Sequence, residues 1–351
     1  MKHRSTVGSR RLGLVLRLAA MLGLLAGCGA SQTPGATTAP TQTSVQLSWF
    51  HTIEFVGFYE AIRQNYYKDA NLDLRLDVGG FDSAGAYIDP VGQVVAGKAD
   101  FGVAGADVIL KARSEGQPVV ALAAIYQRSP VALISLADKK IARPQDLIGK
   151  KIAVQPANST VGIAYEALLT SQKIKHTDLD ETERTDYDTV NALFDNQVDV
   201  LSGFITNDGM KAKQRSDAVN FILISDYGID IYSNVIFTSE ATIKDRPQLV
   251  EAFVKATVRG IQWAVDNPEK ASTNVVDLYG QQMSPDIKST QQPGLLASIP
   301  LLNPAGSRPG QMKDNLWEQA HQILLDQGII KQPIDIKSAY TLAFVDKAYQ
   351  P

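Results

Sequence analysis

Cysteine is nearly absent from this chain, since Cys28 is the only one among 351 residues. A single cysteine cannot form an internal disulfide, and it excludes a metal site built from several thiolates. Histidine is scarce as well: apart from His3, the chain has His51, His176 and His321, which lie far apart in the sequence. The sequence therefore predicts neither a metal site nor a catalytic cysteine, and we expect no cofactor.

Familiar catalytic motifs are also missing. The chain lacks a Gly-x-Ser-x-Gly nucleophile elbow, a Gly-x-x-x-x-Gly-Lys-Ser/Thr phosphate loop and a His-Glu-x-x-His zinc motif. Residues 102–105 form a strand-to-helix turn that does not complete a dinucleotide-binding fingerprint. The acidic residues within 178–183 are interpreted as lying on a solvent-exposed loop and the exposed face of a strand. We therefore expect no catalytic residues and predict that the chain is not an enzyme.

Positive charge is concentrated at the N-terminus and is sparse elsewhere. The formal net charge is -3, but the first 27 residues carry Lys and Arg and no acid. The remainder of the chain has 29 Lys and Arg against 37 Asp and Glu. Nucleic-acid binding depends on neutralisation of phosphates by Lys and Arg. This balance argues against nucleic acid as a partner.

Long apolar runs are lacking too. The one candidate, residues 12–26, is interrupted by Arg17, and the remaining run of about ten residues is too short to span ~30 Å of hydrocarbon. A basic segment, a short apolar run and the ending Leu-Ala-Gly-Cys28 are typical of a signal peptide. Leu-Ala-Gly-Cys resembles the bacterial lipobox, in which the cysteine receives a diacylglycerol. We predict a signal peptide over 1–27, lipidation at Cys28, and a cell-membrane location facing the extracytoplasmic side.

The segment that follows Cys28 is small, polar and Pro-containing, with no apolar periodicity. Such a composition predicts a flexible tether over residues 28–44. Signal, lipid and tether together indicate a body that is held at a membrane through a lipid anchor and works in water.

Strands and helices alternate from Val45 onward. Residues 72–78 alternate apolar and polar side chains with the period of a half-buried strand. The pattern restarts after about Pro144, and it predicts an α/β fold with a mainly parallel sheet. We expect Asp107 to cap one helix and Ser159 or Thr160 to cap another. The predicted strands are 45–49, 72–78, 101–104, 118–125, 151–154, 181–184, 198–202 and 220–224, and the predicted helices include 54–67, 90–97, 187–195 and a long one after 247.

A short internal sequence similarity suggests two similar lobes. Residues 97–105 and 196–203 share a layout of turn, Asp, strand and Gly, with Asp100 and Asp199 at matching places. In open α/β sheets, ligands bind beyond the carboxyl ends of the strands. Two facing lobes would form a cleft lined by strand ends and helix N-termini, whose N–H groups suit polar ligand atoms.

Aromatic and amide side chains near strand ends are the best candidates for binding a ligand. Planar rings there suit stacking on a flat heterocycle, although core packing explains any single one at least as well. The predicted ligand-binding residues are Trp49, His51, Phe55, Tyr87, Tyr126, Gln127, Asn158, Ser159, Tyr187, Asn207 and Tyr232.

The body from about 45 to 348 resembles a known family. The resemblance is carried by Gly57-Phe-Tyr-Glu-Ala61 after Trp49, by Ala124-Ile-Tyr-Gln-Arg-Ser-Pro130, by Gly203-Phe-Ile-Thr-Asn-Asp208 and by the run from Arg259 to Pro268. These pieces, in this order, are similar to NMT1/THI5-like substrate-binding proteins of ABC importers, which bind thiamine-pyrimidine precursors and related compounds.

The resemblance implies a periplasmic-binding-protein-like class II fold. It implies one lobe from 45–132 and 235–351, a second lobe from 133–234, and crossovers near 129–137 and 227–237. Closure of the lobes on a ligand, followed by docking on an ABC permease driven by its ATPase, is the implied mechanism. We expect a monomer, because hinge closure needs no second copy.

The same resemblance bears on the ligand. Pyrimidine binders of this family often carry an Asn and a His before the Gly-Phe-Tyr stretch, where this chain has Thr52-Ile-Glu-Phe55. This stretch is more similar to the riboflavin-uptake branch, so riboflavin is the first expectation. A thiamine pyrimidine precursor, formylaminopyrimidine or hydroxymethylpyrimidine, is the alternative. A pyrimidine-synthesising enzyme is a third, disfavoured because the cysteine-rich motif of the fungal relatives is absent.

Overall fold

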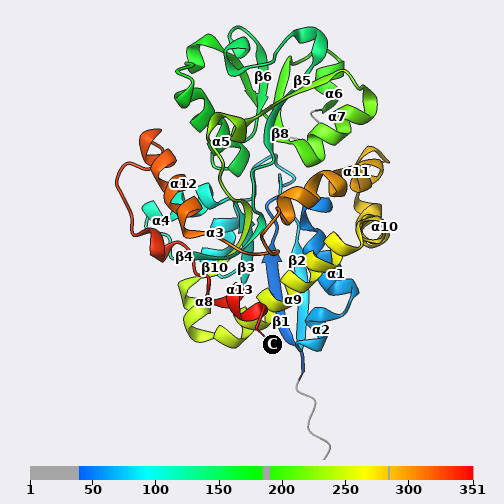
Figure 1. The fold of residues 1–351 in the computed structure, drawn as a ribbon, viewed down its shortest axis with the longest axis vertical. Helices are drawn as coiled ribbons and strands as arrows, with labels where there is room; N and C mark the ends of the chain where they lie inside the picture. The colour runs from blue at the N-terminus through cyan, green and yellow to red at the C-terminus, as the bar shows by residue number, and fades with distance from the viewer. Residues whose placement is uncertain (1–38, 185–189, 284, 351) are drawn as a thin grey trace, which may run out of the picture. The chain divides into compact units, whose positions relative to one another are not determined.

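The computed structural model describes residues 39–184, 190–283 and 285–350. Within these ranges the chain forms two mixed five-stranded sheets with helices packed around them (Figure 1). The predicted signal peptide, the predicted lipidation site Cys28 and the candidate ligand residue Tyr187 lie outside the described residues. The expected α/β class with two sheets is confirmed.

The first sheet has the strand order β2-β1-β3-β10-β4. Strands β1, β2 and β3 run parallel, and β10 is antiparallel to both of its neighbours. Every residue of β4 is buried, as expected for a strand covered on both faces. The strands are β1 (Thr41–Gln46), β2 (Leu72–Asp77), β3 (Phe101–Ala104), β4 (Val119–Tyr126) and β10 (Ser233–Ser239).

The second sheet repeats this plan with the order β7-β6-β8-β5-β9. Here β6 pairs in parallel with β7 and β8, and β5 is the antiparallel strand. The chain passes from the first sheet to the second after β4 and returns after β9. In each case the first strand after the passage is the antiparallel one. The strands are β5 (Val131–Leu136), β6 (Lys151–Val154), β7 (Asp180–Glu183), β8 (Val200–Phe204) and β9 (Val219–Leu223).

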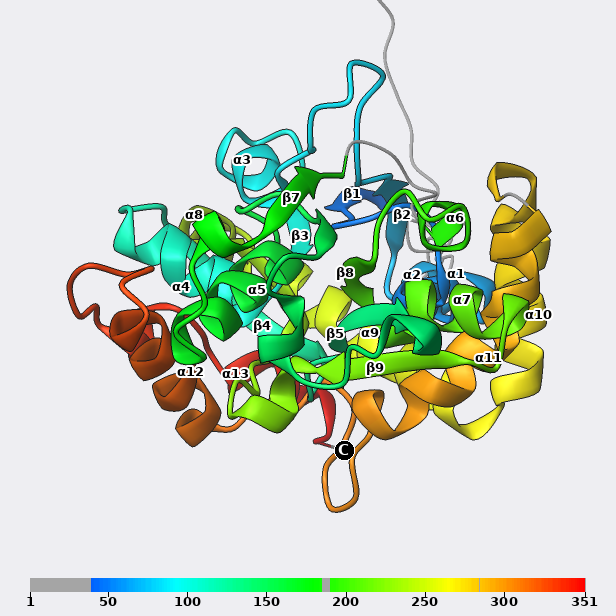
Figure 2. The ribbon, with the colours of Figure 1, turned by 90° about the horizontal axis from the view of Figure 1, so that it is seen from above.

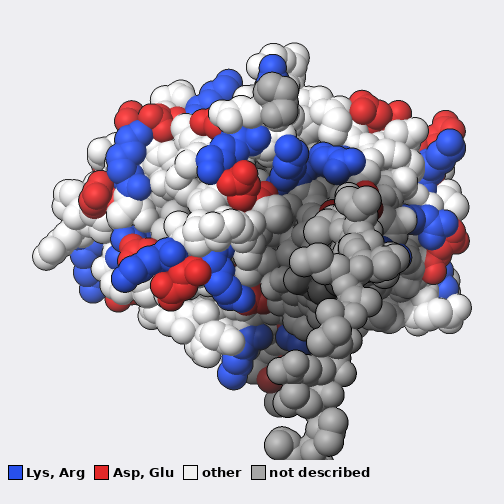
Figure 3. Space-filling view, turned by 90° about the horizontal axis from the view of Figure 1, so that it is seen from below, with Lys and Arg blue, Asp and Glu red and all other residues white. Residues whose placement is uncertain are grey.

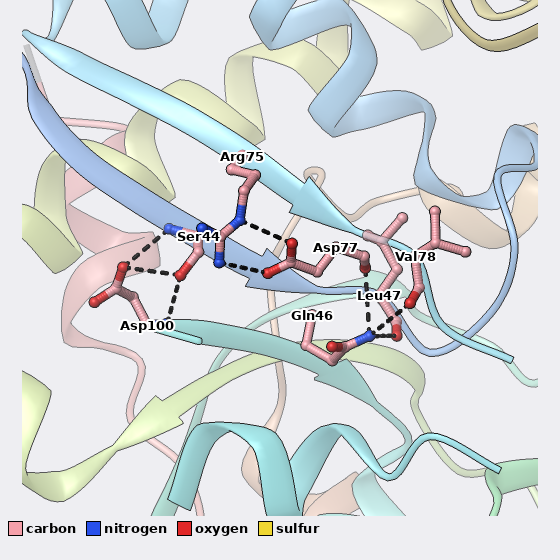
Figure 4. Close-up of polar contacts among 7 residues, drawn as sticks. All are labelled: Ser44, Gln46, Leu47, Arg75, Asp77, Val78 and Asp100. Carbon is pink, nitrogen blue, oxygen red and sulfur yellow. Dashed lines mark hydrogen bonds and ion pairs between the residues drawn. The ribbon is translucent and has the colours of Figure 1, made fainter. Parts of the chain in front are cut away.

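An aspartate ties the first and third parallel strands together in each sheet. In the first sheet, Asp100 accepts hydrogen bonds from the backbone N–H and hydroxyl of Ser44, at 2.9 and 3.1 Å (Figure 4). In the second sheet, Asp199 accepts from the backbone N–H of Lys151 at 3.1 Å. These are the two aspartates at matching places in residues 97–105 and 196–203. The internal sequence similarity therefore reflects the same strand-to-strand contact in both sheets.

Helices cover both sheets, and the later ones pack mainly on the first (Figures 1 and 2). Those around the first sheet are α1 (Val56–Arg63), α2 (Tyr66–Asp69), α3 (Pro90–Val95), α4 (Ala106–Ser114), α8 (Glu240–Asp245), α9 (Pro247–Asp266), α10 (Pro268–Tyr279), α12 (Asp314–Asp326) and α13 (Ala343–Ala348). Those around the second are α5 (Thr160–Ser171), α6 (Val190–Phe194) and α7 (Met210–Arg215). The remaining helix, α11 (Pro285–Leu302), connects the two groups because Ser289 and Gln214 of α7 exchange hydrogen bonds of 2.6 and 2.7 Å.

Close packing of α1 on α9 requires two glycines. A Cβ on Gly57 would clash with Ile261, and a Cβ on Gly260 would clash with the carbonyl oxygen of Gly57. The two backbones therefore approach directly, which explains why glycine stands at these two positions. This contact fixes the start of α1 and, with it, the turn that leads into α1 from β1.

Three local predictions were wrong. The helix expected over 54–67 breaks at Asn65, whose φ of 62° is left-handed, so α1 and α2 are separate. Asp107 does not cap α4: Gly105 stands at the N-cap, and Asp107 is buried inside the first turn. The first strand begins at Thr41, so residues 41–44 of the predicted tether belong to β1, which ends at Gln46 rather than Trp49.

Charged side chains of both signs are scattered over the visible part of the face seen in Figure 3. Several of the surface charges are paired across elements, among them Arg113 with Glu240 and Lys347 with Glu251. Within the described ranges, no helix combines the length and apolar character needed to cross a membrane.

Candidate functional site

A cleft with an empty volume of about 450 Å³ lies where the two sheets face each other. Both sheets contribute to its walls, as expected for a site at the carboxyl ends of strands. Its lining residues are Ser48, Trp49, Glu54, Tyr87, Gln155, Ser159, Thr160, Val161, Gly203, Phe204, Asn207, Asp208 and Asn234.

The aromatic wall begins where β1 ends. The amide of Gln46 donates to the carbonyl oxygens of Leu47, Asp77 and Val78 at 3.1–3.3 Å, which holds the chain as it leaves the strand (Figure 4). Trp49 follows, and its ring packs edge-to-face with those of Phe50 and Phe81, with centroids 5.4 and 5.5 Å apart. These contacts fix the plane of a large aromatic ring in the cleft wall.

A buried carboxyl group stands beside this ring. Glu54 is only 4% exposed, and its two oxygens accept hydrogen bonds from the Thr52 hydroxyl at 2.7 Å and the Asn234 amide at 2.9 Å. Burial raises the pKa of Glu54 to about 7, and the charge of Asp208 adds to the rise. The side chain is therefore a hydrogen-bonding group whose protonation changes near neutral pH.

The opposite wall carries a second carboxylate. Asp208 lies in a π-helical turn, Ile205–Gly209, directly after β8, and accepts from the guanidinium of Arg184 at 3.1 Å. A Cβ on Gly203 would collide with the Asp208 carboxylate, so the glycine is what allows the group to lie against β8. Arg184 also lies over the Trp49 ring at 5.8 Å, which links the charge pair to the aromatic wall.

The N-terminus of α5 completes the cleft. The Ser159 hydroxyl accepts from the backbone N–H of Gly162 at 3.1 Å, so the predicted cap is confirmed. The Thr160 hydroxyl accepts from the backbone N–H of Gly105 at 2.8 Å, a contact between the two sheets. Asp107 lies close by, and burial raises its pKa to about 7.

The structure brings four of the predicted ligand residues together in the cleft. Trp49, Tyr87, Ser159 and Asn207 all line it. Tyr87 is anchored by its hydroxyl, which donates to the carbonyl oxygen of Ser48 at 3.4 Å. Asn207 shares the π-helical turn with Asp208, so its place in the cleft follows from the irregular backbone after β8.

Other candidates are packed in the interior. The His51 ring stacks on Tyr279 with centroids 3.9 Å apart, and burial lowers the pKa of His51 to about 4. Phe55 is fully buried in the core. Tyr126 is fully buried as well and shares a 2.8 Å hydrogen bond with Ser298.

Two more candidates connect the strands to the C-terminal segment. The Gln127 amide donates to the carbonyl oxygens of Leu302 and Arg308 at 2.9 and 2.8 Å. The Tyr232 hydroxyl accepts from the backbone N–H of Lys313 at 2.7 Å. Both residues flank a passage between the sheets, so their observed contacts hold those passages in place.

The last two candidates lie apart from the cleft as described. Asn158 is exposed and lines a separate groove with residues of α3 and α4. Tyr187 lies outside the described residues.

Sequence reasoning missed the two acids and most of the amides. Glu54, Gln155, Asp208 and Asn234 were not among the candidates, yet all line the cleft. Glu54 had a signal, since it is a lone acid in the apolar stretch 52–58. Asn234 had none that we can identify, because it sits inside a strand that was interpreted as a crossover.

The chemistry of this arrangement is recognition by stacking and hydrogen bonding. Trp49 contributes an aromatic ring to the cleft wall, and the acids and amides offer acceptors and donors around it. Among the described residues, His, Cys, Asp and Glu do not form a group of three or more that would hold a metal ion.

Comparison with known proteins finds binding proteins among the relatives of this chain. A family model described as NMT1/THI5 like matches residues 52–271. A riboflavin-binding protein of Chloroflexus aurantiacus is 26% identical over 90% of this chain and 89% of its own length. A formylaminopyrimidine-binding protein of Halalkalibacterium halodurans is 24% identical over 90% of this chain and 94% of its own.

An enzyme is also among the relatives. A 4-amino-5-hydroxymethyl-2-methylpyrimidine phosphate synthase of Legionella pneumophila is 22% identical over 87% of this chain and 92% of its own length. Among solved structures, the alkanesulfonate-binding protein of Xanthomonas axonopodis bound to MOPS superposes with a TM-score of 0.64 at 11% identity. That alignment covers 86% of this chain and 99% of the other, which confirms the periplasmic-binding-protein-like fold.

Proposed function

Since the chain belongs to the NMT1/THI5-like family, we propose that it is the solute-binding component of an ABC importer and that its ligand is riboflavin. The observation that carries the proposal is the cleft between the two sheets, with the ring of Trp49 in one wall and buried polar side chains around it. A flat heterocycle with polar edges fits such a site better than an aliphatic solute does. The riboflavin-binding relative supports this choice of ligand.

The proposed mechanism is closure of two lobes on the ligand. The two passages between the sheets, residues 127–130 and 224–232, are the proposed hinges, and each sheet with its helices moves as one lobe. Contacts such as Gly105–Thr160 and Gln214–Ser289 span the two lobes and would form on closure. The closed form would then dock on the permease and deliver riboflavin.

The proposed site of action is the extracytoplasmic face of the cell membrane. The predicted lipid on Cys28 would hold the protein there as a monomer, and residues 29–40 would serve as the tether. We propose no catalytic step: stacking and hydrogen bonding account for the groups in the cleft, and Cys28 is the only cysteine available to the cysteine-rich chemistry of the fungal relatives.

A formylaminopyrimidine is the second candidate ligand. The observation that favours it is the carboxyl group of Glu54, because an aminopyrimidine presents an N–H donor next to a ring nitrogen that a carboxyl group can pair with. The formylaminopyrimidine-binding relative is consistent with this alternative.

Fluorescence titration with riboflavin tests the proposed stacking. Riboflavin should lose fluorescence on binding the wild-type protein, and Trp49→Leu should weaken binding at least about 10-fold through loss of one stacked ring. Trp263→Leu is the matched control, since Trp263 lies on α9 in a different groove. Equal losses in the two variants would contradict a role for Trp49 in the cleft.

A further inference from the structure

The cleft is unevenly charged. Two carboxylic acids, Glu54 and Asp208, line it, and both are about 95% buried. The buried guanidinium of Arg184 lies beside them, but it is engaged by Asp208 at 3.1 Å and by the carbonyl oxygen of Ser202 at 3.2 Å. Among the described residues that line the cleft there are thus two acids and no lysine or arginine.

The two acids come from opposite walls. Glu54 belongs to the turn between β1 and α1, on the first sheet, and Asp208 follows β8 of the second sheet. Approach of the walls brings like charges together in a region that excludes water, where their repulsion is stronger than in solvent. A ligand that places a second negative charge between them adds to that repulsion, whereas an N–H or O–H donor relieves it.

The N-terminus of α5 is the feature that would favour an anion. Its attraction is offset by three contacts already present. The Ser159 hydroxyl occupies the N–H of Gly162, the Thr160 hydroxyl is held by Gly105, and the buried carboxyl group of Asp107 lies next to that contact.

We propose that this cleft rejects anionic ligands and selects neutral or cationic heterocycles that present hydrogen-bond donors to Glu54 and Asp208. The identity of the heterocycle rests on the proposed function, but the selection by charge goes beyond it. It separates riboflavin from its 5′-phosphate ester, and it separates this chain from the sulfonate-binding protein that shares its fold and was solved with MOPS.

The experiment measures the affinity of the purified protein for three probes: riboflavin, riboflavin 5′-phosphate and MOPS. The variants are Asp208→Asn and Glu54→Gln, each of which removes one negative charge with little change of shape. Glu115→Gln is the matched control, because Glu115 is exposed and pairs with Lys111 on the surface of α4. Circular dichroism melting verifies that each variant is folded before its affinities are compared.

The expected result is a preference of about 100-fold for riboflavin over its phosphate ester in the wild-type protein. This preference should fall at least about 10-fold in one or both neutralised variants, through a gain in affinity for the ester. MOPS should not bind the wild-type protein at millimolar concentration, and Glu115→Gln should behave like the wild type. If one neutralised variant does not fold, the other carries the comparison.

Two outcomes overturn the inference and leave the proposed function intact. The first is equal affinity of the wild-type protein for riboflavin and its phosphate ester, and the second is no gain for either anion in either neutralised variant. Failure of riboflavin to bind overturns the proposed function instead. The MOPS titration then decides the inference, because binding of MOPS by the wild-type protein contradicts it and binding by the neutralised variants alone supports it.

Discussion

Replacing Glu54 with Gln should stabilise the ligand-free protein above pH 7 and destabilise it by about 1 kcal/mol near pH 4, where only the cost of altered hydrogen bonds remains. Burial raises the pKa of Glu54 from 4.5 to about 7. An acid with a higher pKa in the folded state holds its proton more tightly there than in the unfolded chain. The wild-type contribution is therefore favourable below pH 4.5 and is lost as the pH rises through 7. Glutamine does not titrate, so it avoids this loss.

The size of the effect follows from the two pKa values. Their difference of about 2.5 corresponds to about 3 kcal/mol at pH 8, at 1.36 kcal/mol for each pKa unit. The side chain is 4% exposed, so solvent screening reduces this figure little. Rearrangement of the bonds to Thr52 and Asn234 costs about 1 kcal/mol, because an amide accepts through only one of its two atoms. The net expectation is about 2 kcal/mol of added stability at pH 8.

Urea unfolding of the ligand-free protein between pH 4.5 and 8.5 measures this difference. Other carboxyl groups titrate in the same range, so the informative quantity is the free energy of the variant minus that of the wild type at each pH. Glu115→Gln, at an exposed position, should stay within about 0.5 kcal/mol of the wild type throughout. A difference for Glu54→Gln that does not grow between pH 4.5 and 7.5 would refute the reasoning.

Three further predictions concern Gly203, Arg184 and Cys28. Gly203→Ala should lower ligand affinity at least about 10-fold in calorimetric titration, because its Cβ displaces the Asp208 carboxylate; unchanged affinity would refute the placement of Asp208. Arg184→Met should lower the free energy of unfolding by about 3 kcal/mol, because Asp208 then stays buried without the Arg184 guanidinium as its partner. The double variant Arg184→Met, Asp208→Leu should recover part of that loss, and denaturant unfolding measures both. Cys28→Ser should move the protein from the membrane to the soluble fraction without changing ligand affinity, and retention on the membrane would contradict lipidation at this position.

Much of the fold could be predicted from apolar periodicity. Strand β3 has the predicted bounds, and so does β6, because in both a short apolar run is bounded by turn residues. The two antiparallel strands β5 and β10 were missed. Each of their apolar runs stands directly after a passage between the sheets, where the resemblance suggested a crossover. Pairing with distant strands, and not the local sequence, determines that these runs form strands.

The candidate site was predicted less completely, for a physical reason. Periodicity finds positions where strands end and helices begin, and it found Trp49 and Ser159 in this way. It does not show which side chain of a strand end turns toward a facing lobe, so Tyr126 was chosen although it lies in the core. The importance of Glu54 and Asp208 depends on burial and on partners far away in sequence, such as Asn234, which no local pattern reveals.

Calorimetric titration of the ligand-free protein with riboflavin, and separately with formylaminopyrimidine, tests the central claim most directly. The account predicts one-to-one binding of riboflavin with a dissociation constant of about 1 µM or lower, and much weaker binding of the pyrimidine. Binding of the pyrimidine alone, or of neither compound, would contradict the assignment of riboflavin as the ligand of the cleft.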